Sequence, residues 1–322
     1  LRCFYSLNLK DAAAPPTAVA EDGTALPNTA RSEGAAEANT GAGDAIPNVQ
    51  LSSALMYQLM AAEVAVQRGE LGSAFAVYMK LARETRDPRL ARRAAELALQ
   101  ARAMAQGLEA AQLWHELAPN STEASQTLAM LYTGAGRFDD AYTLFKAQLE
   151  AAANPGEELA RIQRALARTQ DRAGAFNLIE RLAQPYSQSA DVKLVLANAA
   201  QAAGLSARAV QEARAAYAIA PDSARAALTA AQYLQASDRP AALALLQDFV
   251  ARHPTVADTR LAYARLLIAD GKFDAARSEF QSLLQADPKN PDLVYSMALL
   301  SMQGKLPADA RTYLQRYLEL IA

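Results

Sequence analysis

Cysteine and histidine are scarce in this chain: Cys3 is the single cysteine, and His115 and His253 are the two histidines among 322 residues. One cysteine excludes an intramolecular disulfide and a cysteine-based metal cluster. Neither histidine belongs to an HExxH motif or has a nucleophile patterned near it, and the sequence contains no glycine-rich phosphate loop. We therefore expect no catalytic residues, no metal site, no cofactor and no enzymatic activity.

The sequence also has little net charge and no long hydrophobic run. The formal net charge of −2 provides no basic field to attract nucleic acid. No stretch reaches the roughly 18 uninterrupted apolar residues that a membrane-spanning helix needs. Nucleic acid is therefore not an expected partner, and membrane contact is expected only through a covalent anchor.

Apolar residues make up 52% of the sequence and aromatic residues 7%, with many alanines, leucines and arginines. This composition is typical of packed helices. The length allows one large core, two domains or an extended array. Composition by itself leaves these alternatives open.

The first 54 residues differ from the rest, as the stretch "DAAAPPTAVAEDGTALPNTARSEGAAEANTGAGDAIPN" shows. Such a segment has too few large apolar residues to offset the entropy lost on ordering, so we expect residues 1–54 to form a disordered tether. Two interpretations of Cys3 stay open. It is the lipidated cysteine of a processed bacterial lipoprotein, or an incidental cysteine in a truncated or tagged start. The residue before a lipidated cysteine is usually Gly, Ala or Ser, whereas Arg2 precedes Cys3 here, which counts against lipidation.

From residue 55 onward the chain repeats itself. The stretch "LYTGAGRFDDAYTLFKAQLEAAANP" (131–155) returns as "LLIADGKFDAARSEFQSLLQADPKNPD" (266–292), and Gly136 and Gly271 correspond, four repeats of about 34 residues apart. Each repeat is expected to be a helix, a tight joint and a second helix. The expected joint residues are Gly69, Arg102, Gly136, Gln170, Gly204, Ser237 and Gly271, with Gly304 one residue short of register.

The seam between the two helices of a repeat has its own pattern. Five residues after the joint a small side chain allows a close helix crossing, and four residues later a mainly large one fills the next turn. The small positions are Ala74, Ala141, Ala175, Ala209, Ala242 and Ala276, and the large ones are Tyr78, Phe145, Ile179, Ala213, Leu246 and Phe280. In the second repeat Trp114 is expected in the core, because Gly107 and Ala111 leave space there; the alternative is an exposed binding anchor. A proline near the end of the second helix recurs at Pro119, Pro221, Pro254 and Pro288, with Pro88 and Pro155 offset.

This pattern resembles the tetratricopeptide repeat (TPR), whereas the Thr-Pro-Leu-His signature of ankyrin repeats of similar length is absent. The resemblance implies an all-α, right-handed superhelix (α-solenoid) of about eight helix-turn-helix repeats over residues 55–322. The expected units are 55–87, 88–121, 122–155, 156–189, 190–222, 223–256, 257–289 and 290–322.

In TPR domains the first helix of each pair lines a concave wall that binds other proteins. Carrying the wall positions over gives Arg92, Glu96, Gln126, Met130, Arg164 with Arg168 adjacent, Asn198, Gln201, Gln232, Gln235 and Arg265. Arg, Asn and Gln suit hydrogen bonding to the backbone or carboxylates of a bound peptide; the alternative is an ordinary solvated face. A chaperone-type carboxylate clamp is disfavoured, because Asn198 is preceded by Leu194 and followed by Thr229 and Ala262 at the corresponding positions.

Residues 57–124, above all "ARETRDPRLARRAAELA" and "AAQLWHELAPN", are similar to the opening repeats of proteobacterial outer-membrane TPR lipoproteins. The resemblance implies a lipid-anchored, periplasm-facing adaptor that binds a carboxyl-terminal processing protease and its substrates, often cell-wall hydrolases. The alternative is a structural scaffold in secretion, pilus or exopolysaccharide assembly. The apolar last helix, with Tyr313 and Leu318, leads us to expect further repeats beyond it; the alternative is a second copy covering it.

Overall fold

The computed structural model describes residue 47 and residues 49–322, so the expected tether and Cys3 lie almost wholly outside the described residues. The first helix begins at Ser53, one residue before the expected end of the tether at residue 54. Within the described part there are sixteen α-helices, a short 3-10 turn at Gln184–Tyr186 and no β-strand. The all-α fold expected from the sequence is therefore confirmed there.

The α-helices follow one another as eight antiparallel pairs. Their bounds are α1 Ser53–Gln67 and α2 Leu71–Thr85; α3 Pro88–Gln100 and α4 Met104–Leu117; α5 Thr122–Gly134 and α6 Phe138–Ala151; α7 Pro155–Leu166 and α8 Arg172–Ala183; α9 Ala190–Ala202 and α10 Ser206–Ile219; α11 Ala224–Ser237 and α12 Arg239–Arg252; α13 Ala257–Ala269 and α14 Phe273–Ala286; α15 Pro291–Gln303 and α16 Pro307–Ile321. None of these helices is long and apolar enough to cross a membrane.

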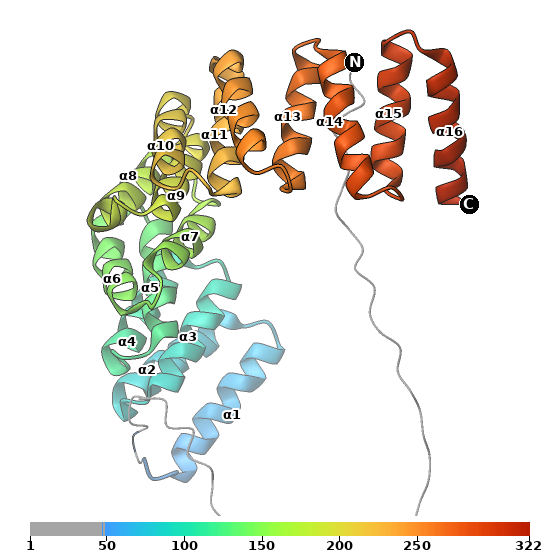
Figure 1. Ribbon diagram of the computed structural model, residues 1–322. Coiled ribbons are helices and arrows are strands. Elements are labelled where there is room, and N and C mark those ends of the chain that lie inside the picture. Colours follow the sequence, from blue (N-terminus) through green and yellow to red (C-terminus); the bar gives the residue numbers. More distant parts are fainter. Residues whose placement is uncertain (1–46, 48) are drawn as a thin grey trace, which may run out of the picture. The chain divides into compact units, whose positions relative to one another are not determined.

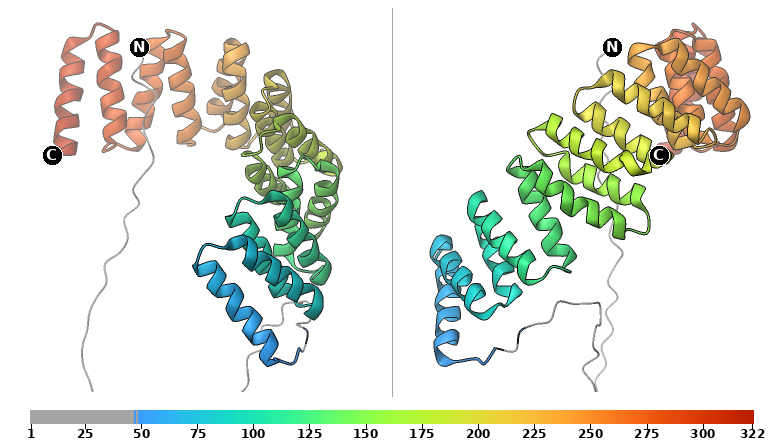
Figure 2. Two further views of the ribbon diagram at one scale, coloured as in Figure 1. Left: turned by 180° about the vertical axis from the view of Figure 1, so that it is seen from behind. Right: turned by 90° about the vertical axis from the view of Figure 1, so that its left-hand side faces the viewer.

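Each helix packs against its neighbours in chain order, and each pair packs against the next (Figure 1). The same succession from α1 to α16 is visible from two further directions (Figure 2). Buried apolar clusters lie between consecutive helices along the whole stack. This arrangement is that of a solenoid, in which a single helix pair cannot bury its apolar faces and the neighbouring pairs cover them.

Six of the eight pairs share one joint of three residues. Its middle residue has a positive φ in every case, and these residues are Gly69, Arg102, Gly136, Gly204, Gly271 and Lys305. The amide of the third joint residue donates to a carbonyl five residues earlier at 2.8–2.9 Å. This is a Schellman cap, which satisfies carbonyls left open at the end of the first helix. A left-handed residue favours glycine, which explains four of the six.

Three of the expected joint positions are wrong. Gly304 has φ −74°, and Lys305 beside it adopts the left-handed conformation instead. Gln170 lies inside a longer connection between α7 and α8, residues 167–171, and Ser237 is the last residue of α11. A single residue, Asp238, joins α11 to α12 and caps both helices.

The expected seam is confirmed. Ala74, Ala141, Ala209, Ala242 and Ala276 have no exposed surface, and all six large positions are buried. Ala175, in the fourth pair, differs from the other small positions because it is only half-buried. Trp114 is buried at 6% exposure, as expected for a core residue, and the guanidinium of Arg92 lies 5.6 Å from its ring centre.

The prolines delimit helices. Pro119, Pro221, Pro254 and Pro288 each stand two residues beyond the end of a second helix, as the sequence pattern predicts. The offset Pro88 and Pro155 instead open α3 and α7, where the missing amide hydrogen costs nothing.

Candidate functional site

The predicted wall residues lie on the first helices of pairs two to seven. They comprise Arg92 and Glu96 on α3, Gln126 and Met130 on α5, Arg164 on α7, Asn198 and Gln201 on α9, Gln232 and Gln235 on α11, and Arg265 on α13. All are exposed except Gln126, which is half-buried. Arg168 is exposed but follows the end of α7, so it belongs to the α7–α8 connection.

The wall residues of α3 are engaged in ion pairs. Arg92 contacts Glu96 at 3.0 Å and Glu123 of α5 at 2.8 Å, while Arg93 reaches Glu63 of α1 at 3.2 Å. These groups are largely exposed, and exposed ion pairs contribute about 0–1 kcal/mol each. Because their charges are already paired across α1, α3 and α5, this part of the wall matches the solvated-face interpretation better than a binding site.

The buried residue Tyr78 of α2 also belongs to this network. Its hydroxyl donates to Glu63, and that hydrogen bond, with the charge of Arg93, holds the pKa of the Glu63 carboxyl below its usual value. Burial, followed by the bond to Glu63, raises the pKa of Tyr78 to about 12. Both shifts favour the protonated phenol and the ionised carboxylate, which is the state that the hydrogen bond requires.

Two further wall residues have partners on a neighbouring first helix. With its amide oriented to suit its surroundings, the Gln126 oxygen accepts from the Arg161 guanidinium of α7 at 2.9 Å. The Asn198 side-chain oxygen accepts from the Tyr233 hydroxyl of α11 at 2.6 Å. Both contacts link one pair to the next, so these side chains stabilise the stack.

The remaining polar wall residues have no side-chain hydrogen bond or ion pair within residues 47–322. They are Arg164, Arg168, Gln201, Gln232, Gln235 and Arg265. Exposed guanidinium and amide groups without internal partners are available to an incoming ligand.

Three of them surround a cavity of about 280 Å³ between α11, α12 and α13, which we call the α11–α13 cavity. The exposed side chains of Gln232, Gln235 and Arg265 border it. Leu246 and Leu266, both buried, provide an apolar floor. An apolar depression with a few converging polar groups is the usual form of a ligand-binding surface.

A second cavity of about 180 Å³, the α7–α9 cavity, lies between α7, α8 and α9. Leu166, Phe176 and Ile179 form its buried wall, and Gln163 and Arg172 are its polar lining residues. Sequence reasoning missed Arg172 because this residue begins a second helix, and the predicted wall consisted of first helices. The available signal was the missing joint glycine at Gln170, two residues earlier.

The two cavities border the two pairs whose joints break the three-residue rule. The α7–α8 connection is longer, and the α11–α12 connection is a single residue. A Schellman joint sets the entry angle of the following helix, so a different joint changes how the helices meet. In the fourth pair α7 and α8 also pack less closely than the helices of the other pairs. We attribute the cavities to these irregular joints.

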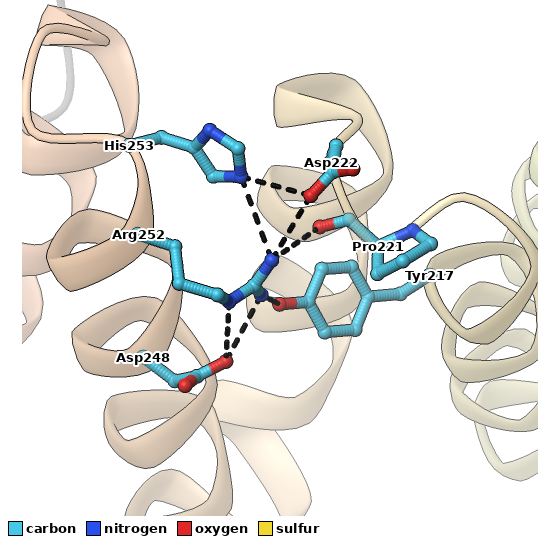
Figure 3. Close-up of polar contacts among 6 residues, drawn as sticks. All are labelled: Tyr217, Pro221, Asp222, Asp248, Arg252 and His253. Carbon is cyan, nitrogen blue, oxygen red and sulfur yellow. Dashed lines mark hydrogen bonds and ion pairs between the residues drawn. The ribbon is translucent and has the colours of Figure 1, made fainter.

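A polar cluster on the second helices has a different character (Figure 3). Arg252 of α12 donates to the Tyr217 hydroxyl at 2.6 Å and contacts Asp248 at 2.9 Å and Asp222 at 3.1 Å. His253 also lies 3.0 Å from Asp222. Tyr217 belongs to α10 and Asp248 to α12, while Asp222 lies in the α10–α11 connection and His253 directly follows α12. The cluster therefore holds two neighbouring pairs together.

Sequence profiles described as tetratricopeptide repeat match residues 229–291 and 267–321. Over 213 residues the chain is 29% identical to TPR repeat-containing protein PA4667 of Pseudomonas aeruginosa. The matched region covers 65% of this chain and 35% of that protein. The chain thus spans about a third of the length of this relative. The chain contains tetratricopeptide repeats, and proteins built from them are in general non-catalytic scaffolds that bind other proteins.

Among solved structures, the chain is similar to a crystal structure of MamA, at 18% identity and a TM-score of 0.43, over 49% of this chain and 93% of that one. It is also similar to MamA from Desulfovibrio magneticus RS-1, at 17% identity and a TM-score of 0.43, over 52% of this chain and 97% of that one. Within the described residues no group of three or more His, Cys, Asp or Glu side chains is placed to hold a metal ion.

Proposed function

We propose that this protein is a non-catalytic adaptor that binds segments of other proteins along its first helices. More specifically, we propose that the adaptor binds a carboxyl-terminal processing protease and presents protein substrates such as cell-wall hydrolases to that protease. Holding both on one stack raises their effective concentration for each other, which accelerates cleavage without any chemistry by the adaptor.

The observation that carries the proposal is the α11–α13 cavity. Gln232, Gln235 and Arg265 come from two successive first helices, border one apolar depression and have no partner of their own within the described chain. Glutamine offers both a donor and an acceptor to a peptide backbone, and arginine offers a fork of donors to carbonyl or carboxylate oxygens. The apolar floor has room for a side chain of the bound segment.

We further propose that the protein faces the periplasm, anchored to the outer membrane through a lipid on Cys3. The support is the similarity of residues 57–124 to outer-membrane lipoproteins of this repeat class and the tether-like composition of residues 1–54. Stable anchoring takes two acyl signals, so a protein whose Cys3 carries at least two acyl chains should fractionate with membranes. The intact mass of the mature protein tests this directly, because an acylated cysteine adds a large hydrophobic increment.

The adaptor function is tested by co-purification from envelope extract followed by mass spectrometry. We expect the wild-type chain to retain a carboxyl-terminal processing protease and a wall hydrolase, and the Gln232→Glu/Arg265→Glu variant to lose at least one of them. Arg214→Glu is the matched control, because Arg214 is an exposed, unpaired arginine on the second helix α10. Retention of secretion, pilus or exopolysaccharide components instead would replace the adaptor by an assembly scaffold, and equal retention by wild type and double variant would overturn the site.

A further inference from the structure

We propose that the α7–α9 cavity is an anchoring site for an acidic segment of a partner protein, with one large apolar side chain of that segment entering the cavity. This inference rests on the proposed protein-binding function and names the chemistry of one ligand. It concerns a different place on the stack from the α11–α13 cavity.

The cavity is an opening in a seam that is closed elsewhere. In the neighbouring pairs the small residues Ala141 and Ala209 have no exposed surface, whereas their counterpart Ala175 is half-buried and lines the cavity. Protein interiors are normally packed without such voids. The walls formed by Phe176 and Ile179 are apolar, so the chemistry that fits is an aliphatic or aromatic side chain.

The unpaired charge along residues 164–172, of which Arg172 lines the cavity, identifies the rest of the ligand. Arg164, Arg168 and Arg172 follow one another at four-residue spacing, and none has an ion pair within residues 47–322. Arg172 lines the cavity, while Arg164 and Arg168 are each next in sequence to a lining residue. In most of the stack, by contrast, arginines are paired with carboxylates, as Arg161 is with Glu158.

Nearby carboxylates do not cancel this surplus. Glu158 is paired with Arg161, and Asp171, which accepts from the Gly174 amide at 2.8 Å, forms no ion pair with the three arginines. A single carboxylate would leave two of the three guanidinium groups unused. Three unpaired cations therefore favour a segment with several acidic side chains over a lone chain terminus.

The α11–α13 cavity provides an internal comparison. It has Arg265 as its one cation and two glutamines beside it, so its chemistry suits backbone amides more than an acidic sequence. The two cavities thus differ in the charge of the ligand that they favour, and a charge variant at one should not affect binding at the other.

The test is fluorescence anisotropy of a labelled peptide with a leucine flanked on each side by glutamates, titrated with the full chain. We expect Arg168→Gln/Arg172→Gln to weaken binding at least tenfold, and Arg265→Gln to leave it unchanged. The exposed lining residue Ala202 is replaced in Ala202→Trp to block the cavity, with a similar loss expected. Because all four substituted side chains are exposed, the variants should fold, and circular dichroism verifies this.

Two altered peptides separate the contributions. Replacing the leucine by alanine should weaken binding because the cavity stays empty, and replacing the glutamates by glutamines should weaken it in a salt-dependent way. Binding that ignores the leucine is only charge attraction and overturns the proposal, as does binding that survives the arginine substitutions. Absence of any binding by wild type also overturns it. If wild type binds no peptide but co-purification still depends on Arg265, the acidic-segment proposal fails and the adaptor function is retained.

Discussion

Arg102 and Gly136 occupy the same place in equivalent joints, with φ of 56° and 73°. Both are the middle residue of a three-residue connection closed by the same hydrogen bond from the next residue to a carbonyl five positions earlier. The fold therefore demands a left-handed residue at this point whether or not the sequence provides glycine. Arg102 adopts that conformation at a cost that glycine does not have.

Arg102→Gly should consequently stabilise the protein by about 0.5–1 kcal/mol, because relief of the left-handed strain exceeds the added freedom of glycine in the unfolded chain. Arg102 is exposed and unpaired, so no contact is lost. The measurement is the urea midpoint of unfolding. Gly136→Ala is the matched reverse substitution and should lower the midpoint, and a lower midpoint for Arg102→Gly would contradict the strain argument.

Glu212 is the most deeply buried charged residue of the described chain, at 2% exposure. Its carboxylate lies 2.8 Å from both Lys193 and Arg208, whose side chains are less buried. Glu212→Gln should destabilise by about 2–4 kcal/mol, because two cations lose their shared counter-charge in a partly dry site. Glu180→Gln, at an exposed partner of the same Arg208, should cost less than about 1 kcal/mol in the same urea titration.

Gly174 allows α8 to approach the ring of Phe138. A Cβ placed there would lie 2.2 Å from a Phe138 ring carbon, so Gly174→Ala forces a shift of the ring or of the helix. We expect a loss of about 1–3 kcal/mol, the usual cost of overpacking. The control is Gly72→Ala, where a Cβ meets nothing within 4 Å and helix propensity should stabilise slightly. Equal thermal midpoints for the two variants would refute the close contact.

The contact between Glu63 and Tyr78 should give stability a dependence on pH. The pKa of Tyr78 is raised from 10.0 to about 12, so its contribution is complete below pH 10 and is lost as pH rises through about 12. The pKa of Glu63 is lowered from 4.5, so its contribution is present above pH 4.5 and is lost as pH falls further. In denaturation series, the stability difference between wild type and Tyr78→Phe should stay constant between these limits and shrink beyond both. A difference that is flat through pH 12 would disprove the link.

Much of the fold was predictable because each repeat must solve the same local problem. The small alanines and large apolar residues of the seam follow the joint at fixed intervals, and burial at nearly all of these positions is what the helical period requires. The same logic misplaced the left-handed residue at Gly304, since a glycine in the joint is the residue type expected to adopt that conformation. The backbone places Lys305 there instead, because the Schellman hydrogen bonds fix the register and not the residue type.

The candidate site was predictable in part. Sequence positions placed Gln232, Gln235 and Arg265 on first helices, but not around one cavity, because helix spacing is a property of two pairs together. Nor could the sequence reveal that Arg92 pairs with Glu123 of α5, or that Asn198 is held by Tyr233 of α11. Partners on neighbouring helices are about 30 residues away in the chain and are chosen by packing.

The sequence by itself determined a succession of helix pairs, since apolar residues at helical spacing can be buried only by stacking such pairs. It also determined which side chains enter the seams. Only the tertiary structure decided where the stack is incomplete: the connection at 167–171 and the single residue Asp238 alter how neighbouring helices meet, and a cavity borders each. The physical reason is that burial is set by local periodicity, whereas a gap depends on the relative placement of three helices that no single repeat specifies.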